Sequence, residues 1–520
     1  MKRINIYFAI SLWLSLAVTA QNPTDSLWHL LPYSKKGNAG IGYQEAVKMM
    51  KGKIPQPIIV AIADAGVDIY HPDLINNLWK NPLEIEDNGI DDDENGYIDD
   101  LYGWNFIGET TYDNMELTRQ YARLNRIYEL KPEAQAKNTD EYTIYLKMKE
   151  KFLKQKREAK LYFDFFQGIN EGVESIEKQY GGNIDKTTIE NHKSKGKSEE
   201  IAKRMIIRYA KMTKSFDLET MKKDLEEGYK QYDYMHNYAY NTSFDPRSEF
   251  VGDEYYNLTE RVYGNNQVYY GEDFSSHGTH VAGIVAADGS NDFGAKGICS
   301  SCKIMSIRNV PEGDERDKDV ANGIRYAVDN GAKIVNMSFG KGYSDFPLAV
   351  KEAIQYAASK DVLLVHAAGN DGKNNDKSDN FPHDFKDAYP NWIEVGASNW
   401  KSGSKALAPF SNYGKSEVDL FSPGVDIYST TPENQYEAYD GTSMASPVVS
   451  GVAAFVWSYY PSLSASQLKD IILQSSVPIK GRVKIPGSKR KTRAQKLSKT
   501  GGLVNLPNAL RLAEKTIAQP

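Results

Sequence analysis

Cysteine is nearly absent from this chain of 520 residues, which has two. Two cysteines cannot build a disulfide framework or a zinc finger. Beyond the first twenty residues, no apolar run reaches the roughly 18 residues of a membrane-spanning helix. Basic charge is not in excess either, because 63 Lys and Arg face 69 Asp and Glu, a net charge of -6. These absences exclude a polytopic membrane protein and leave no global electrostatic signature of nucleic-acid binding.

The N-terminus has the pattern of a signal peptide. Lys2 and Arg3 precede an apolar run over residues 4–18, and small residues lead to a cleavage position after Ala20. Polar residues follow, and the run is shorter than a spanning helix, which disfavours a retained transmembrane anchor. We therefore expect an exported protein, periplasmic or secreted. Export favours a disulfide between Cys299 and Cys302 over a redox pair or half of a metal site.

Short apolar runs rich in Val and Ile alternate with amphipathic helical patterns. The runs cover residues 57–63, 303–310, 332–337, 361–368 and 392–397. Helical patterns lie between them, for example at 319–330 and 348–360. This alternation predicts an α/β fold with a doubly wound, mostly parallel sheet flanked by helices.

A different composition runs from about residue 108 to 250, dense in Lys, Glu and Tyr and poor in Gly. One stretch keeps alternating steps of three and four, as in a helical hairpin or a coiled coil, at Tyr145, Met148, Phe152, Gln155, Ala159, Tyr162 and Phe166. The pattern predicts an inserted α-helical subdomain. The expected organisation is a signal peptide (1–20), an N-terminal extension (21–53), the α/β domain in two parts (54–107 and 251–520) and the helical insertion (108–250).

Polar side chains stand at the carboxyl ends of three predicted strands. These are Asp64, Ser338 and Asn370. In an open parallel sheet such ends border the crevice that binds ligands. A single Asp there would often be only a helix N-cap.

Two further motifs place reactive groups at predicted helix starts. His277-Gly278-Thr279-His280 carries an imidazole, and Gly441-Thr442-Ser443 carries a hydroxyl. Pro447 lacks the N–H that would have bonded the Ser443 carbonyl, which is tolerable only near a helix start. A serine hydroxyl becomes a nucleophile when a base takes its proton and a carboxylate orients that base.

With Asp, His and Ser in this chain order, the sequence resembles the subtilisin-like serine peptidases. The resemblance covers about residues 28–101 and 273–513. It implies that Ser443 is the nucleophile, His277 the general base and Asp64 the residue that orients the imidazole. Asn370 would be the oxyanion-hole amide, and His280 would be structural. Ser338, Phe339 and Gly340 match the segment against which the family lays an extended substrate.

The resemblance implies an endopeptidase that cleaves protein or peptide substrates through an acyl-enzyme. The alternative is a catalytically silent relative whose helical insertion binds a partner or an inhibitor. A lipase or esterase is disfavoured because no Gly-x-Ser-x-Gly motif occurs. A preference for basic residues upstream of the cut is a further hypothesis, based on four acidic residues expected near the opposite wall of the cleft: Glu312, Asp314, Glu315 and Asp317.

Two charge runs remain. Nine acidic residues and no basic one lie between Glu84 and Asp100, and they include the start of an EF-hand-like calcium loop. Its expected ligands are Asp91, Asp93, Asn95, the Tyr97 carbonyl and Asp99. The twelfth position is Tyr102 instead of Glu, so a plain solvated acidic turn is the competing interpretation. Nine basic residues and no acidic one lie between Lys480 and Lys499, either a solvated loop or a docking surface.

Overall fold

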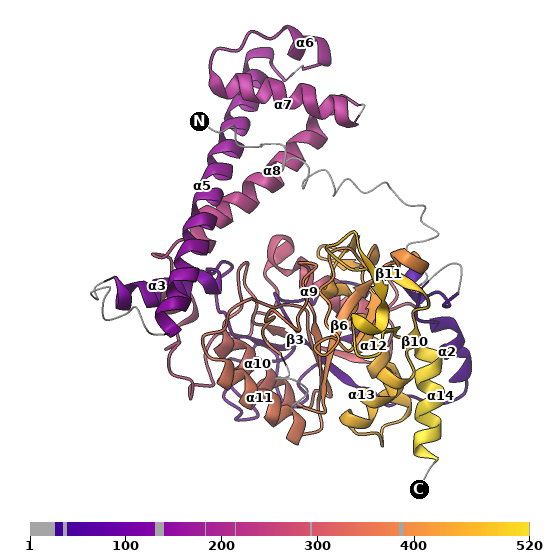
Figure 1. The fold of residues 1–520 in the computed structure, drawn as a ribbon. Helices are drawn as coiled ribbons and strands as arrows, with labels where there is room; N and C mark the ends of the chain where they lie inside the picture. The colour runs from indigo at the N-terminus through magenta and orange to yellow at the C-terminus, as the bar shows by residue number, and fades with distance from the viewer. Residues whose placement is uncertain are drawn as a thin grey trace.

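The computed structural model consists of an α/β body and a helical arm that stands away from it (Figure 1). The residues that the structure describes are 27–34, 39–129, 140–182, 184–213, 215–291, 294–383 and 389–518. The expected signal peptide at 1–20 lies outside them. Within the described part of the chain, no helix combines the length and the apolar character needed to cross a membrane.

A nine-stranded sheet forms the centre of the body, with the order β10-β13-β7-β6-β5-β4-β1-β3-β2. All neighbours pair in parallel except β10 with β13. The strands are β1 Ile59–Asp64, β2 Gly103–Asn105, β3 Lys303–Arg308, β4 Ile334–Met337, β5 Leu363–Ala367, β6 Trp392–Ser398, β7 Leu420–Pro423, β10 Val477–Pro478 and β13 Gly502–Leu503. Two antiparallel ribbons accompany the sheet, β8 Ile427–Thr431 with β9 Gln435–Tyr439 and β11 Arg482–Lys484 with β12 Lys491–Arg493.

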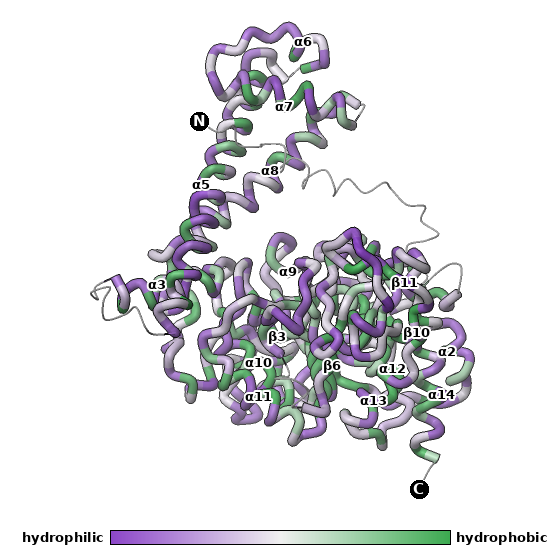
Figure 2. Tube along the Cα trace, in the orientation of Figure 1, coloured by the Kyte–Doolittle hydropathy of each residue, from purple (hydrophilic) through white to green (hydrophobic). Residues whose placement is uncertain are grey.

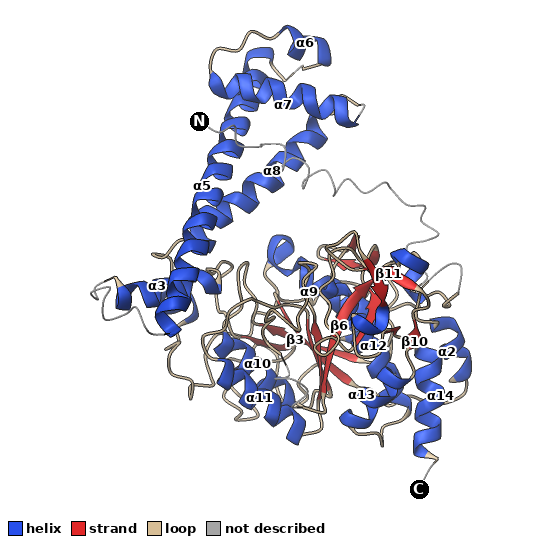
Figure 3. Ribbon diagram, in the orientation of Figure 1, coloured by secondary structure: helices blue, strands red, loops and turns tan. Residues whose placement is uncertain are grey.

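Helices cover both faces of this sheet (Figure 3). Successive residues of a strand point to opposite faces, so Val60 and Ile62 enter one core while Ala61 and Ala63 enter the other. The first core contains α2 Tyr43–Met49, α9 Gly271–Ala286, α12 Thr442–Tyr459, α13 Ala465–Gln474 and α14 Leu506–Ile517. The second contains α10 Asp317–Asp329 and α11 Pro347–Ser359. The prediction of a doubly wound, mostly parallel sheet is confirmed.

Each of the five predicted strands is present, with ends that shift by up to two residues. The sequence did not indicate β2, β7, β10 or β13, which have two to four residues. Strands this short carry too few side chains to show a hydrophobic period. Their places are set by pairing with neighbours already in the sheet.

The N-terminal extension packs as part of the body. The indole N–H of Trp28 donates to the carbonyls of Val425 and Asp426 at 3.0 and 3.1 Å. The N–H of Leu506, the first residue of α14, donates to the Ile41 carbonyl at 3.0 Å. The Trp28 bonds hold the described start of the extension against the loop after β7, and the Ile41 bond and the apolar face of α2 hold its later part against α14.

The predicted helical insertion is an arm built on one long helix. The helices are α3 Glu116–Tyr128, α5 Asp140–Tyr180, α6 Lys186–Asn191, α7 Lys197–Thr213 and α8 Leu218–Tyr234, followed by the π-helical turns Met235–Ala239 and Arg247–Val251. α5 has 41 residues, a length of about 60 Å. Most of the expected seam faces inward, since five of its seven residues are buried and the other two are half-buried.

The arm has two separate apolar cores. The base core joins α3, the first half of α5 and residues 234–240, and the tip core joins the second half of α5 with α7 and α8. Figure 2 shows the arm helices as mixed stripes of hydrophobic and hydrophilic colour, in contrast to the more continuous green inside the body. The described members of the tip core all lie between residues 162 and 232, so the tip core contains no residue of the body.

Candidate active site

Asp64 and His277 meet at the carboxyl end of the central strand. Asp64 is the last residue of β1, and His277 lies on α9. The Nδ1 of His277 is 2.7 Å from Oδ1 of Asp64, although the two residues are 213 apart in sequence. Gly278 allows this approach, because a Cβ there would lie 2.1 Å from the Gly66 carbonyl oxygen. A glycine therefore follows His277 for a steric reason.

The environment of this pair favours a charged imidazole. Burial by itself would lower the pKa of His277, but the charge of Asp64, the hydrogen bond to it and the charge of Glu312 together raise that pKa above its usual value. Asp64 is buried, whereas 40% of the His277 side chain is exposed. The second imidazole nitrogen, Nε2, forms no hydrogen bond with any described residue, which leaves it available to a hydroxyl or a substrate.

Ser443 is the second residue of α12 and is bonded to Ser338 in both directions. Its hydroxyl donates to the Ser338 carbonyl at 3.0 Å, and the Ser338 hydroxyl donates to the Ser443 carbonyl at 2.8 Å. In a regular helix the Ser443 carbonyl would accept from the N–H of residue 447, but that residue is a proline and has no N–H. The bond from the Ser338 hydroxyl replaces the missing one. In this structure the Ser443 hydroxyl is bonded to the Ser338 carbonyl and not to His277.

Asn370 is held beside the start of the same helix. Its Oδ1 accepts from both the N–H and the hydroxyl of Thr442 at 2.9 Å. The N–H of Gly369 donates to the Thr442 hydroxyl at 3.1 Å. Because Oδ1 is occupied, the Nδ2 group is left to donate elsewhere. The structure thus brings an amide donor and the N-terminus of α12 to one place.

The extended segment after β4 offers free main-chain groups. Phe339 and Gly340 form no main-chain hydrogen bond with the described residues, and neither does Gly313 in the loop on the opposite wall. Gly313 follows Glu312, whose N–H and carbonyl bond Thr111 and Asp113 at the start of the insertion. Unpaired main-chain groups of this kind can pair with an extended chain.

The four acidic residues of that loop differ in their surroundings. Asp317 pairs with the Lys341 ammonium at 2.8 Å, and Asp314 accepts from the Glu116 N–H at 2.8 Å. Glu315 is buried, and its burial raises its pKa to about 7. Glu312 is the one exposed residue of the four, and its charge acts on His277. Three of the four acids are therefore structural, which narrows the hypothesis of a basic preference to Glu312.

A buried charge network ties both cleft walls to the arm. We call it the arm-base network: Asp113, Glu116, Arg119, Arg316 and Lys341. Lys341 directly follows the Ser338–Phe339–Gly340 segment, and its Nζ donates to the Glu315 carbonyl at 2.6 Å and lies 3.3 Å from Glu116. Burial would raise the pKa of Glu116, but Arg119 and Lys341 outweigh it and lower that pKa to about 2. No sequence motif marked Lys341, because its partners come from two distant segments, the start of the arm and the loop of residues 315–317.

His280 and the two cysteines have structural surroundings. His280 is buried, its Nε2 lies 3.1 Å from the Glu437 carbonyl, and its ring stacks on Tyr439 at 4.3 Å. Burial lowers the pKa of His280 to about 3, so its ring is neutral. Cys299 and Cys302 form the expected disulfide.

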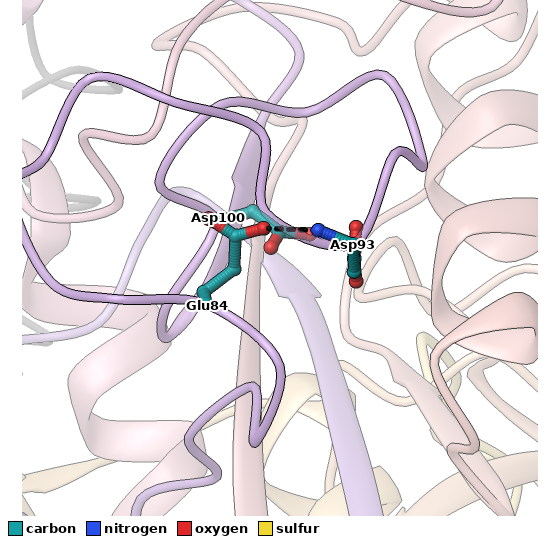
Figure 4. A group of neighbouring side chains, drawn as sticks. All are labelled: Glu84, Asp93 and Asp100. Atoms are coloured by element: carbon teal, nitrogen blue, oxygen red, sulfur yellow. Dashed lines mark hydrogen bonds between the residues drawn. The ribbon is translucent and has the colours of Figure 1, made fainter.

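The acidic loop forms a carboxylate cluster that shares Asp93 with the predicted ligands and adds two other residues. Oxygens of Glu84, Asp93 and Asp100 lie within 4.8 Å of one another (Figure 4). Asp91 instead accepts the N–H groups of Asn95 and Gly96 at 3.1 and 2.7 Å. Asp99 is turned away, because its carboxylate accepts from the N–H groups of Asn88 and Gly89.

The cluster has the chemistry of a cation site. Glu84 is 8% exposed, and its Oε2 has no hydrogen-bond partner. Burial raises the pKa of Asp100 to about 6, even though Tyr326, Asn81 and Asn95 donate to its carboxylate. Three carboxylates this close repel unless a proton or a cation joins them, so the residues present fit a hard cation with oxygen ligands.

Comparison with known proteins shows the family of this chain. A sequence model of the subtilase family matches residues 56–503. The chain belongs to the subtilase family. Relatives include Subtilisin NAT of Bacillus subtilis subsp. natto, 38% identical over 200 residues (38% of this chain, 50% of the relative), and the thermophilic serine proteinase of Bacillus sp. (strain AK1), 41% identical over 186 residues (35% and 43%).

The match to these subtilases is partial in length. The chain spans about half the length of the curated subtilisins it first matches. Among solved structures, a mutant of the protease domain of PatA is 28% identical with a TM-score of 0.40, covering 48% of this chain and 85% of that one.

Proposed function

We propose that this chain is a serine endopeptidase that hydrolyses peptide bonds through Ser443, His277 and Asp64. The 2.7 Å contact between Asp64 and His277 carries the proposal. It places the proton of the neutral imidazole on Nδ1, since a carboxylate can only accept, and so leaves Nε2 as the base. Membership of the subtilase family supports the same assignment. Export by the signal peptide, to the periplasm or the exterior, is part of the proposal.

Substrate arrival releases the nucleophile. An extended substrate that pairs with the segment after β4 brings a main-chain N–H to the Ser338 carbonyl. That carbonyl now accepts the Ser443 hydroxyl, which the substrate displaces toward Nε2 of His277. His277 takes the proton as Ser443 attacks the substrate carbonyl, then passes it to the leaving amine. Water hydrolyses the acyl-enzyme by the reverse sequence.

Two donors stabilise the oxyanion of the tetrahedral intermediate. They are the Nδ2 group of Asn370 and the main-chain N–H of Ser443, which lies at the positive end of the α12 dipole. An Asn370→Ala variant should lose about 10²- to 10³-fold in kcat, the usual cost of one oxyanion donor. Main-chain pairing selects extended segments, so the substrates are unfolded proteins or exposed loops.

Comparison of two serine variants tests the activity. Ser443→Ala should reduce casein hydrolysis by at least about 10⁴-fold, because no other group can form the acyl bond. Ser276→Ala is the matched control, since Ser276 precedes His277 but its hydroxyl bonds Tyr439. Sequencing of the exported protein should find Gln21 at its N-terminus. Equal hydrolysis by the wild type and Ser443→Ala would overturn the proposed mechanism.

The rival function is a silent subtilase whose arm binds a partner or inhibitor. The separate tip core of the arm is the observation that favours it, because this core contains no residue of the body. A purified mature wild type that hydrolyses neither casein nor a peptide library, together with retained capture of a partner by the arm, would favour this function. Hydrolysis that depends on Ser443 would reject it.

We also propose a structural calcium ion bound by Glu84, Asp93 and Asp100. The unpartnered Oε2 of Glu84 and the closeness of the three carboxylates support it. The raised pKa of Asp100 means that without a cation this residue favours the fold most at low pH and loses that contribution as pH rises through about 6. Bound calcium should restore the contribution of Asp100 to stability at higher pH.

Thermal unfolding tests the calcium site. With EDTA, the melting temperature should fall more at pH 7.5 than at pH 5, and calcium should reverse the fall. Asp93→Asn should remove the response, whereas Asp99→Asn should keep it, since Asp99 bonds main-chain groups instead. An unchanged melting temperature with EDTA at pH 7.5 would contradict the site.

A further inference from the structure

The hairpin of β11 and β12 places like charges directly opposite one another. Arg482 pairs with Arg493 and Lys484 with Lys491 across the two strands. All four side chains are exposed, while Val483 between them is buried. Opposed like charges in a ribbon are destabilising. The arrangement therefore requires an explanation beyond solubility.

No residue in the described part of the chain forms an ion pair with the cations of this segment. Between residues 480 and 496 there are eight basic residues and no acidic one. None of the eight forms an ion pair with a described residue, in contrast to Lys499, which lies 2.9 Å from Asp419. We call this segment the basic hairpin, residues 480–496. Its charge faces outward and is uncompensated.

Two clefts flank the basic hairpin. A cleft of about 850 Å³ on one side is lined by Lys480, Arg482, Arg493 and Lys496, among others. A second cleft of about 360 Å³ brings Lys484 together with Lys401 and Lys405 from another part of the chain. Neither cleft has an acidic residue in its lining. Cations from separate segments thus converge on two adjoining grooves.

The basic hairpin is fixed to the body and is not a free solvated loop. The N–H of Ile485 donates to the Arg490 carbonyl at 2.9 Å and closes the hairpin, and the N–H of Gly487 donates to the Pro409 carbonyl at 2.8 Å. A Cβ on Gly487 would lie 2.7 Å from the Gly372 carbonyl oxygen, so the tip fits tightly against the body. Cations held in place lose little freedom when an anion binds.

From these observations we propose that the basic hairpin binds a linear anionic polysaccharide. Such a chain can lie in both grooves and offer one sulfate or carboxylate group to each cluster of cations. Residues 480–496 contain no aromatic side chain on which nucleic-acid bases could stack. They also present no exposed large hydrophobic side chain that could enter a bilayer. Figure 1 shows β11 at the end of the body opposite α3, so binding there leaves the arm accessible.

Heparin serves as the probe. At 150 mM NaCl the wild type should bind heparin, with affinity that falls steeply as salt increases, and should not bind neutral dextran. A quadruple variant, Arg482→Gln, Lys484→Gln, Lys491→Gln and Arg493→Gln, should bind at least about tenfold more weakly, because four fixed cations are lost. Its melting temperature should be equal to or slightly above that of the wild type, because opposed like charges are removed, and its casein hydrolysis should match that of the wild type.

A control variant removes the same charge from the arm, with Lys160→Gln, Lys178→Gln, Lys186→Gln and Lys211→Gln. It should bind heparin as the wild type does. The proposal is overturned if both variants lose affinity equally, which would indicate net charge alone, or if the wild type does not bind heparin. Equal or tighter binding to a DNA duplex or to phosphatidylglycerol vesicles would assign the basic hairpin to that partner and also contradict the proposal.

Discussion

The base and the tip of the arm are both helical, but they are held together by different forces. At the base, the charged side chains of the arm-base network are almost fully buried and bond both walls of the cleft. At the tip the core is mainly apolar and contains a buried polar pair, His192 with Glu199, while lysine ion pairs such as Lys222 with Glu177 lie toward the surface. Buried ion pairs tolerate no loss of one partner. The base is therefore coupled to the cleft, whereas the tip can vary independently.

Removal of Lys341 should have the largest effect. Lys341→Met leaves the buried Asp317 without its cation partner and leaves the buried Glu116 paired with Arg119 alone. We expect a loss of about 3–5 kcal/mol in the free energy of unfolding, with a lower kcat/KM because the segment before Lys341 shifts. Urea unfolding and casein hydrolysis measure both effects.

Lys222→Met is the matched control at the tip. Lys222 pairs with Glu177 at 3.0 Å, but its side chain is 39% exposed, so the variant should lose at most about 1 kcal/mol and keep full activity. Equal losses in the two lysine variants would remove the distinction between base and tip.

Tight packing at the tip gives the next effect. A Cβ at position 172 of α5 would lie 2.3 Å from the Ser198 carbonyl oxygen on α7, so Gly172→Ala should force the two helices apart. The expected cost is about 1–3 kcal/mol, seen as faster amide exchange in α7 with unchanged casein hydrolysis. Gly168→Ala, whose Cβ would meet only one atom at 4.0 Å, should be neutral or stabilising. Impaired catalysis in Gly172→Ala would show that the tip is coupled to the cleft.

Glu312→Gln should give the smallest effect of these variants. It should change only catalysis and substrate preference in the cleft. Because the Glu312 charge helps to raise the pKa of His277, its removal should lower that pKa. His277 then stays neutral, and able to act as the general base, down to a lower pH. The acid limb of the pH profile of kcat/KM should therefore move to lower pH. Glu312→Gln should also weaken the preference for Lys or Arg upstream of the cut, as measured with a peptide library.

Glu272→Gln removes a charge from the first turn of the same helix, α9, and should leave both the pH profile and the preference unchanged. A pH profile that stays in place for Glu312→Gln would show that Glu312 does not act on the imidazole.

The sequence was sufficient to predict what depends on short motifs and regular spacing. It predicted the parallel sheet, the inserted helices and the position of Asp64 and His277 at one edge, because strand ends and glycine-marked helix starts are local features. It also placed Ser443 at the start of α12, where Pro447 indicates a helix beginning.

Features that depend on through-space neighbours were not predictable. The spacing of the acidic loop suggested Asp99, but its backbone has a φ of 53°, in the left-handed region, and its carboxylate points to other N–H groups. Asp100 and Glu84 take part instead. Lys341 has no motif, since its partners belong to the arm and to the opposite wall. Nor did the sequence indicate that the Ser443 hydroxyl bonds the Ser338 carbonyl.

Stoichiometric labelling with a fluorophosphonate tests most directly whether Ser443 and His277 act together. Mass spectrometry of the mature protein should find one label per chain, on the peptide that contains Ser443. His277→Ala should abolish the label, and Ser276→Ala should retain it, because only the imidazole can take the hydroxyl proton. Absence of label in the wild type, or label on Ser443 that persists without His277, would contradict the proposed catalytic arrangement.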